Sequence, residues 1–284
     1  MRVANRNGRL SLVIDGRIVD VERSSGGTFS SDPQRVWDDW DGFVSWASGA
    51  DHGPGEVFDL GELDAPVPRP RQVFAIGINY AEHAAEAGYP PDALPVTFTK
   101  FPSSLTGPVA HVQLSSATVD WEVELVVVVG AQCDFVKRDE AWTHVAGAMV
   151  GQDLSDRTVQ AVGTKPQYSL AKSYRGYSPT GPWVTTIDEL PSRDDLAIQC
   201  SLSGEVMQSS RTSSLIYDIP ELIERLSAIC TLFPGDLIFT GTPAGVGNAR
   251  SPKRFIGADD VLVSTIEGLG ELTTTFLAPV VDRS

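Results

Sequence analysis

Residues 120–130 are DWEVELVVVVG, and this run organises both the fold and the chemistry that the sequence predicts. Its second half, residues 125–129, is rich in β-branched side chains and predicts a buried strand. Because side chains alternate along a strand, Glu122 and Glu124 point to the same face, about 7 Å apart along the backbone. Two carboxylates at the mouth of an apolar strand need a cation or a shared proton, and Mg²⁺ is the natural oxygen-liganded partner. The alternative is a strand end with two solvated glutamates.

The composition limits the classes of function. The 284 residues include 22 basic and 37 acidic side chains, and the net charge of −15 argues against nucleic-acid or anionic-membrane partners. The three cysteines lack CxxC spacing and fit a reducing compartment. The polar N-terminus lacks the apolar core of a signal peptide, and residues 125–129 are too few to cross a bilayer. We therefore expect a soluble, cytoplasmic protein with no nucleic-acid and no membrane partner.

Residues 1–66 predict a small N-terminal module that contains a hairpin and a helix. Asp15-Gly16 separates two apolar runs, which is typical of a hairpin turn. We expect the helix to begin after Asp32 and to end at Gly49, and its three tryptophans to pack onto the main body rather than to stack on a ligand. The stiff run PVPRP at residues 66–70 marks the boundary, so a second domain is expected over residues 70–284.

The second domain begins with a buried strand over residues 73–78 and continues into a short helix. His83 and Glu86 lie three residues apart on that helix and therefore face one another. A carboxylate that orients an imidazole raises its basicity, which makes a general base. The alternative is an exposed helix with two solvated polar residues.

Further polar residues follow the central strand. The apolar stretch 142–153 ends in Asp153, which can bring a third carboxylate to the first two. Arg157 and Gln160 come next, spaced by one helical turn. Lys172 stands in a largely uncharged neighbourhood, where a lysine is either a surface residue that extends to solvent or, in a cleft, an anion ligand.

The C-terminal third alternates strands with one helix. Residues 196–216 predict a hairpin around Ser203-Gly204, residues 220–233 an amphipathic helix with Ile229 inward, and residues 261–266 and 271–276 a final pair of strands. The glycine-rich run 241–247 lacks the Lys-Ser/Thr of a P-loop and precedes no helical pattern that a dinucleotide fingerprint needs. Its backbone N–H groups and the Thr242 hydroxyl could instead bind a carboxylate.

Five of these segments, in this order, resemble the fumarylacetoacetate hydrolase superfamily over about residues 70–280. They are IGINYAEH (76–83), DWEVEL (120–125), GQD (151–153), LAKS (170–173) and GDLIFTGTPAGVG (235–247). Each run alone is weak evidence, but the five together are specific. The resemblance implies a mainly β fold with α-helices (α+β), a mixed β-sandwich roll of the fumarylacetoacetate hydrolase C-terminal type that is usually a homodimer.

The resemblance also implies roles for individual residues. Glu122, Glu124 and Asp153 are expected to bind Mg²⁺ or Mn²⁺, with Asp120 as support rather than as a ligand. His83 and Glu86 are expected to activate water, and Lys172 to be the basic residue beside the metal. The expected substrate contacts are Arg157, Gln160 and Thr242.

One departure narrows the expected function. Mammalian-type fumarylacetoacetate hydrolases carry an extra acidic metal ligand shortly before the histidine that corresponds to His83. In this chain the segment before that histidine, residues 73–78, is uncharged. The chain therefore resembles the shorter, three-carboxylate branch, and we expect hydrolysis of a carbon–carbon bond in a 2,4-diketo acid, a small oxo-acid substrate, through a metal-stabilised enolate. The alternatives are a 2-hydroxyhepta-2,4-diene-1,7-dioate isomerase, an oxaloacetate-type decarboxylase and, with less support, a non-catalytic oxo-acid binder.

Overall fold

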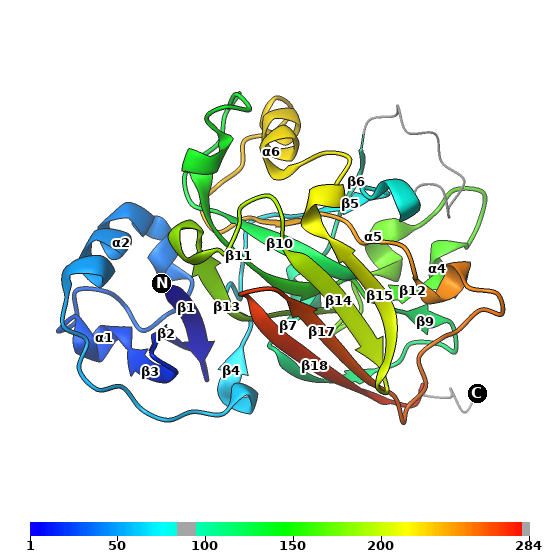
Figure 1. The fold of residues 1–284 in the computed structure, drawn as a ribbon, viewed down its shortest axis with the longest axis horizontal. Helices are drawn as coiled ribbons and strands as arrows, with labels where there is room; N and C mark the ends of the chain where they lie inside the picture. Colours follow the sequence, from blue (N-terminus) through cyan, green and yellow to red (C-terminus); the bar gives the residue numbers. More distant parts are fainter. Residues whose placement is uncertain (84–94, 280–284) are drawn as a thin grey trace.

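Two β-sheets packed against each other form the body of the protein (Figure 1). The computed structural model describes residues 1–83 and 95–279. The N-terminal elements are β1 (Arg2–Arg6), β2 (Arg9–Ile14), β3 (Arg17–Asp20), α1 (Val21–Ser24), α2 (Trp40–Gly49) and β4 (Leu63–Asp64). The central elements are β5 (Val73–Gly77), β6 (Val96–Thr99), β7 (Leu105–Thr106), β8 (Val109–Gln113), β9 (Val119–Asp120), β10 (Val123–Val129), β11 (Val145–Gln152), β12 (Ser155–Asp156), α4 (Arg157–Gln160) and α5 (Tyr168–Ala171). The C-terminal elements are β13 (Ser178–Thr186), β14 (Ala197–Leu202), β15 (Glu205–Arg211), α6 (Ile219–Ser227), β16 (Leu237–Phe239), β17 (Val261–Ile266) and β18 (Gly270–Leu277).

The larger, 11-stranded sheet has β10 near its middle. Its main path runs β3-β2-β1-β13-β11-β10-β16-β5-β6, with β4 paired to β1 and β7 to β13. Strand β10 pairs antiparallel with both β11 and β16, and all seven of its residues are buried. A valine-rich strand suits this position because its branched side chains fill the space on both faces, and each fully buried side chain contributes about 1.5–3 kcal/mol.

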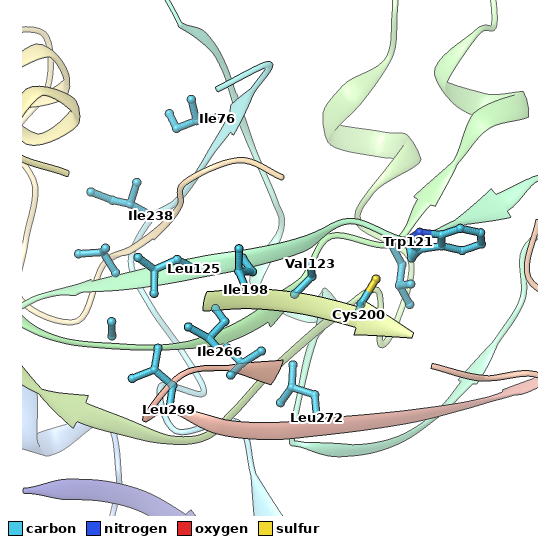
Figure 2. Close-up of a cluster of buried hydrophobic side chains, with 14 of the residues drawn as sticks. Ile76, Trp121, Val123, Leu125, Ile198, Cys200, Ile238, Ile266, Leu269 and Leu272 are labelled. Carbon is cyan, nitrogen blue, oxygen red and sulfur yellow. The ribbon is translucent and has the colours of Figure 1, made fainter. Parts of the chain in front are cut away.

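The smaller, five-stranded sheet has the order β15-β14-β17-β18-β8 and packs on one face of the larger one. Trp121, Val123 and Leu125 point into the core between the two sheets, where they meet Ile198 and Leu272 (Figure 2). Alternation along β10 therefore turns the side chains of the even-numbered residues, including Glu124, to the other face.

The other face of the larger sheet is covered by the N-terminal module. Val126 and Val128 of β10 belong to a second core that also contains Trp37, Trp40 and Phe43. Strand β1 pairs with β13, so the N-terminal hairpins extend the larger sheet, as the blue strands beside β13 show in Figure 1. The boundary at residues 66–70 remains a prediction, and the tryptophans pack in the core as expected.

The predicted α+β fold, a mixed β-sandwich, is confirmed, and most strand predictions agree with it. The turn at Asp15-Gly16 has positive φ at both residues, 48° and 73°, as does Ser203-Gly204, with 51° and 86°. Residues 73–77, 261–266 and 270–277 form strands. Within the described part of the chain, no helix is long and apolar enough to cross a membrane.

Two helix predictions were wrong in detail. After Asp32 the chain forms a short 3₁₀ helix over Arg35–Asp38, and the expected α-helix begins only at Trp40, where Asp39 accepts from the Gly42 N–H. Ile229, expected to face inward, is 84% exposed, because α6 ends at Ser227.

Candidate active site and metal centre

Three carboxylates meet where β10 and β11 lie side by side. Glu122 precedes β10, Glu124 lies within it, and Asp153 follows β11. Antiparallel pairing sets Val123 opposite Gln152, and the Asp153 N–H donates to the Glu122 carbonyl at 2.9 Å. One oxygen atom of each carboxylate lies within 4.8 Å of the others, and all three side chains are buried. The structure thus brings together the three residues expected to bind a metal.

The charge of this carboxylate cluster suits a divalent cation. Burial raises the pKa of Glu124, and the charges of Asp153 and Glu122 raise it further, well above its ordinary range. Burial also acts to raise the pKa of Glu122, but the charges of Lys172 and Arg157 lower it to about 2. Glu124 therefore carries the least balanced charge of the cluster. A hard ion that takes oxygen ligands, Mg²⁺ or Mn²⁺, would balance it, so these residues fit such a metal.

Two buried lysines donate hydrogen bonds to carboxylates of this cluster. Lys172 Nζ donates to Glu122 Oε2, Asp153 Oδ2 and Ser155 Oγ, each at 2.7 Å. Lys100 Nζ donates to Asp153 Oδ1 and to the Lys172 carbonyl. Asp153 is therefore held by both lysines, which fixes the direction of its carboxylate. Lys172, expected to be the basic residue beside the metal, thus contacts two of the three carboxylates, and its role remains a prediction.

Lys100 is the residue of this centre that sequence reasoning missed. Its side chain is fully buried, and its charge faces Asp153, which lies 53 positions further along the sequence. A signal was present, because Lys100 is the sole Asp, Glu, Lys or Arg between residues 93 and 119. A lone charge in such a stretch supports the second interpretation given for Lys172, a lysine that contacts an anion inside a cleft.

Arg157 connects the cluster to Asp120. Its Nε donates to Asp120 Oδ1 at 2.6 Å, its Nη2 to Glu122 Oε1 at 2.5 Å, and its Nη1 to Gln160 Oε1 at 2.8 Å. Asp120 Oδ2 accepts from the Asn248 N–H at 2.7 Å, so Asp120 holds Arg157 and lies outside the carboxylate cluster. The seven ionisable groups named so far, four carboxylates and three cations, carry a net charge of −1 when all are ionised.

A cavity of about 390 Å³ opens onto this centre. Its wall includes Glu122 and Lys172 from the charged side and His83 from the segment after β5. The three expected substrate contacts line the same cavity, namely Arg157, Gln160 and Thr242. Glu86, the expected partner of His83, lies outside the described residues, so the dyad remains a prediction.

The glycine-rich run supplies part of the floor. The Gly241 N–H donates to Glu124 Oε2 at 2.8 Å, so the carboxylate that this run binds is the chain's own. Thr242 Oγ1 donates to the Val123 carbonyl and accepts from Gln208 Nε2, both at 2.8 Å. Its hydroxyl is thereby fixed at the cavity wall.

One residue that lines the cavity has a strained backbone conformation. Ile78 lines the cavity with φ of 60°, a conformation that costs a β-branched residue about 1–3 kcal/mol. The next residue, Asn79, holds it there: its Nδ2 donates to the carbonyls of Tyr217 and Thr240, and its Oδ1 accepts from the Tyr217 N–H. Such strain is typical of functional segments.

A second cavity is larger than the one beside the carboxylate cluster, so volume alone would place the active site there. A hollow of about 630 Å³ lies between the N-terminal module and the body, lined by Arg35, Trp37, Arg69 and Phe233 among others. The carboxylate cluster does not line it. We place the active site at the smaller cavity because the buried, charge-coupled groups are there.

The chain is similar to known proteins over most of its length. The family model "Fumarylacetoacetate (FAA) hydrolase C-terminal" matches residues 72–277. Oxaloacetate tautomerase FAHD2A of Bos taurus, a mitochondrial protein, is 42% identical over 208 residues, which are 72% of this chain and 66% of the relative. The 2,4-didehydro-3-deoxy-L-rhamnonate hydrolase of Sphingomonas sp. (strain SKA58) is 42% identical over 209 residues, which are 72% of this chain and 73% of the relative. The chain thus spans just under two thirds of the tautomerase.

Solved structures extend the similarity to the whole chain. A Mycobacterium smegmatis protein with the provisional designation HpcE is 49% identical with a TM-score of 0.95, over 98% of this chain and 99% of that one. Maleylpyruvate hydrolase from Sphingobium sp. SYK-6, solved with manganese(II) and pyruvate, is 28% identical with a TM-score of 0.79, over 99% of this chain and 100% of that one. Both comparisons include the N-terminal module.

Proposed function

The chain belongs to the fumarylacetoacetate hydrolase family of enzymes, and we propose that it hydrolyses a carbon–carbon bond in a 2,4-diketo acid of the acylpyruvate class. The observation that carries this proposal is the buried cluster of Glu122, Glu124 and Asp153 beside Lys172, at a cavity that His83 also lines. Two relatives support it: maleylpyruvate hydrolase was solved with pyruvate, and the rhamnonate hydrolase acts on a compound oxidised at C2 and C4.

Glu122, Glu124 and Asp153 would hold the Mg²⁺ or Mn²⁺ ion. When bound, the ion acts as a Lewis acid that stabilises negative charge on the substrate's 2-oxo and carboxylate oxygens. With all seven groups ionised and a divalent ion bound, the centre would carry a net charge of +1, which would attract a substrate carboxylate.

His83 is the proposed general base. Its imidazole takes a proton from water, and the water oxygen forms a bond to C4 of the substrate while the π bond of the C4 carbonyl opens to an oxyanion. The C4 carbonyl then re-forms as the C3–C4 bond breaks, the electron pair of that bond passes to C3 and the 2-oxo group as an enolate, and C3 takes the proton back from the imidazole. The products are a 2-oxo acid and a carboxylic acid, and Glu86 is proposed to orient the imidazole.

Lys172 has two proposed tasks. Its ammonium group donates to Glu122 and Asp153 at 2.7 Å, which keeps both carboxylates aimed at the metal position. It also lines the cavity, where a fixed positive charge favours the enolate that forms as the C3–C4 bond breaks. Arg157, Gln160 and Thr242 are proposed to contact the substrate.

Oxaloacetate tautomerisation is the second candidate, and the 42% identity to the bovine tautomerase favours it. This reaction moves a proton between C3 and the 2-oxo oxygen and needs no attacking water. Isomerisation of a dienedioate and decarboxylation of oxaloacetate would also leave the attacking water unused. A non-catalytic oxo-acid binder would need no base at all.

A panel of three substrates separates these functions. Acetylpyruvate, maleylpyruvate and oxaloacetate are followed by enol absorbance, with Mg²⁺ or Mn²⁺ and after chelation, while pyruvate is measured separately. Metal-dependent release of pyruvate and acetate in equal amounts supports hydrolysis. Interconversion of oxaloacetate enol and ketone without loss of acetylpyruvate would instead establish a tautomerase.

A histidine variant tests the water-activating step. We expect His83→Ala to lower hydrolysis by about 10²–10⁴-fold while metal binding persists. His111→Ala is the matched control, because His111 is exposed on β8 in the second sheet. Full hydrolysis by His83→Ala would refute the proposed base.

The assembly is proposed to be a homodimer, as the family resemblance implies. One chain has a mass of 30.5 kDa, so light scattering after size-exclusion chromatography should give twice that mass. A mass of one chain at micromolar concentration would refute this proposal without bearing on the active site.

A further inference from the structure

Gln208 is a buried glutamine whose side-chain amide uses all of its hydrogen-bonding positions. It lies on β15, the edge strand of the smaller sheet (Figure 1). Its Oε1 accepts from the Val123 N–H at 3.0 Å and from Cys200 Sγ at 3.3 Å. Its Nε2 donates to Thr242 Oγ1 at 2.8 Å and to the Pro243 carbonyl at 2.7 Å. The orientation of the amide is fixed, because an N–H can only donate and a carbonyl can only accept.

A β-bulge turns Gln208 into the core. Where β15 pairs with β14, Cys200 lies opposite Gln208 and Ser201 lies opposite Val206, so Met207 is an extra residue. Strict alternation would bury only one of two neighbouring residues, yet Met207 and Gln208 are both buried. Bulges of this kind re-aim side chains beside active sites, and this one directs Gln208 to the strand that carries Glu124.

The glycine-rich run 241–247 packs directly on this bulge. The Met207 carbonyl accepts from Arg250 Nη2 at 2.8 Å, and Arg250 Nε donates to the Gly245 carbonyl at 3.3 Å. A Cβ on Gly245 would overlap the Met207 carbonyl oxygen, so only glycine lets the two backbones approach this closely. The bulge and the glycine-rich run therefore hold each other in place.

The peptide groups of Val123 face away from β11. The Asp153 N–H donates to the Glu122 carbonyl, so residue 122 faces β11, and alternation turns the N–H and C=O of Val123 to the side of β16. Strand β16 pairs with residues 126–128 of β10. The polar groups of Val123 therefore lie past the end of that pairing, where side chains rather than a strand receive them.

Gln208 holds both of these polar groups. It accepts from the Val123 N–H directly, and it donates to Thr242 Oγ1, whose hydroxyl donates to the Val123 carbonyl at 2.8 Å. A buried peptide group needs such partners, so these bonds keep residue 123 in an extended conformation. That conformation sets Glu122 and Glu124 on one face of the strand.

We propose that Gln208 is a positioning residue of the metal centre. By holding Val123 it fixes the separation of the Glu122 and Glu124 carboxylates, and by holding Thr242 it fixes the adjoining wall of the cavity. The smaller sheet thus takes part in metal binding without contributing a ligand. This inference rests on the metal site of the proposed function and not on the reaction.

Calorimetric titration with Mn²⁺ tests the proposal, at a temperature below the onset of unfolding of every variant. Gln208→Met keeps the size of the side chain and removes its hydrogen bonds. We expect the variant to bind Mn²⁺ about 10–100-fold more weakly, the range for residues that orient metal ligands. The electron paramagnetic resonance spectrum of bound Mn²⁺ should also change, because the zero-field splitting of this ion depends on how its ligands are arranged.

Two controls separate positioning from general destabilisation. Met207→Ala opens a cavity at the neighbouring buried position, where the side chain is apolar. It should lower the Tm of the metal-free protein and leave the Kd and the spectrum of bound Mn²⁺ unchanged. Gln199→Met, at an exposed position of β14, controls for the loss of an amide and should behave as the wild type.

Wild-type affinity and spectrum in Gln208→Met would overturn the proposal, and so would an equal loss of affinity in Met207→Ala. If Gln208→Met does not fold, Gln208→Asn takes its place. Its amide is one methylene shorter and cannot reach both Val123 and Pro243, so the same loss is expected. Wild-type affinity in Gln208→Asn would then overturn the proposal.

The outcome is separable from the proposed function. If acetylpyruvate is not hydrolysed but Gln208→Met weakens Mn²⁺ binding selectively, the reaction assignment fails and the positioning role stands. If acetylpyruvate is hydrolysed and Mn²⁺ affinity does not depend on Gln208, the positioning role fails and hydrolysis stands. A wild type that binds no Mn²⁺ would overturn both.

Discussion

Replacement of Glu124 by glutamine should have opposite effects on the metal-free and the metal-loaded protein. The pKa of Glu124 is raised by burial and by two neighbouring carboxylates. The folded chain therefore keeps this proton to a higher pH than the unfolded chain does. As the pH rises from the unfolded to the folded pKa, the free energy of unfolding falls by about 1.4 kcal/mol per pH unit. Glutamine does not ionise, and its carbonyl can still accept from the Gly241 N–H. Metal-free Glu124→Gln should therefore be at least as stable as the wild type.

The metal-loaded protein should show the reverse. Loss of a residue that merely orients a ligand costs about 10–100-fold in metal affinity, so loss of a ligand should cost at least about 100-fold. At a metal concentration about 100 times the wild-type Kd, the wild type gains about 2.7 kcal/mol, and the variant at the same concentration about 0.4 kcal/mol. For a chain of this size these gains correspond to about 5 °C and about 1 °C in Tm.

The assay is a thermal melt with and without Mn²⁺, together with calorimetric titration of the metal. Glu205→Gln, at an exposed hairpin, is the matched control and should behave as the wild type in both states. An unchanged Tm gain for Glu124→Gln would refute its role as a ligand. Strong destabilisation of the metal-free variant would refute the charge argument.

Three further predictions concern the same centre. Because the raised pKa of Glu124 makes protons compete with metal, Mn²⁺ affinity should fall as the pH is lowered through that pKa, and calorimetry at several pH values checks this; a pH-independent affinity would contradict it. Lys100→Met should weaken Mn²⁺ binding about 10–100-fold, since Asp153 loses one of its two lysine donors, whereas Lys137→Met should not; equal affinities would dismiss Lys100 as a positioning residue. Gly241→Ala should cost about 2–4 kcal/mol in denaturant unfolding, because φ is +99° and a Cβ would lie 2.7 Å from Asn79 Cβ; a loss under about 0.5 kcal/mol would show that the loop can move.

The carboxylate cluster was predictable because it depends on local rules. The period of two along a strand places Glu122 and Glu124 on one face whatever the strand pairs with. Asp153 followed from its position at the end of an apolar stretch, and the order of the five family segments supplied the remaining expectations. These arguments need only nearby sequence or the order of motifs along the chain.

The features that were missed depend on contacts between distant segments. Lys100 reaches Asp153 only because β6 and β11 belong to one sheet, and no local pattern reports that. The positive φ of Ile78 contradicts the preference of a β-branched residue. It is held by Asn79, which donates to the carbonyls of Thr240, directly after β16, and of Tyr217, shortly before α6. Asp32 accepts both from the Gln34 N–H and from the distant Arg69, and a 3₁₀ helix rather than an α-helix follows it.

The strand that carries Glu124 is also the strand on which the N-terminal module rests. Val126 and Val128, two and four residues beyond Glu124, pack against Trp37 and Phe43 of that module. Removal of the first 66 residues would bare this apolar face and leave β13 with unpaired backbone groups where β1 had been, a template for aggregation. A shortened version of this enzyme would therefore need another segment to cover that face and edge, even though every proposed ligand lies beyond residue 66.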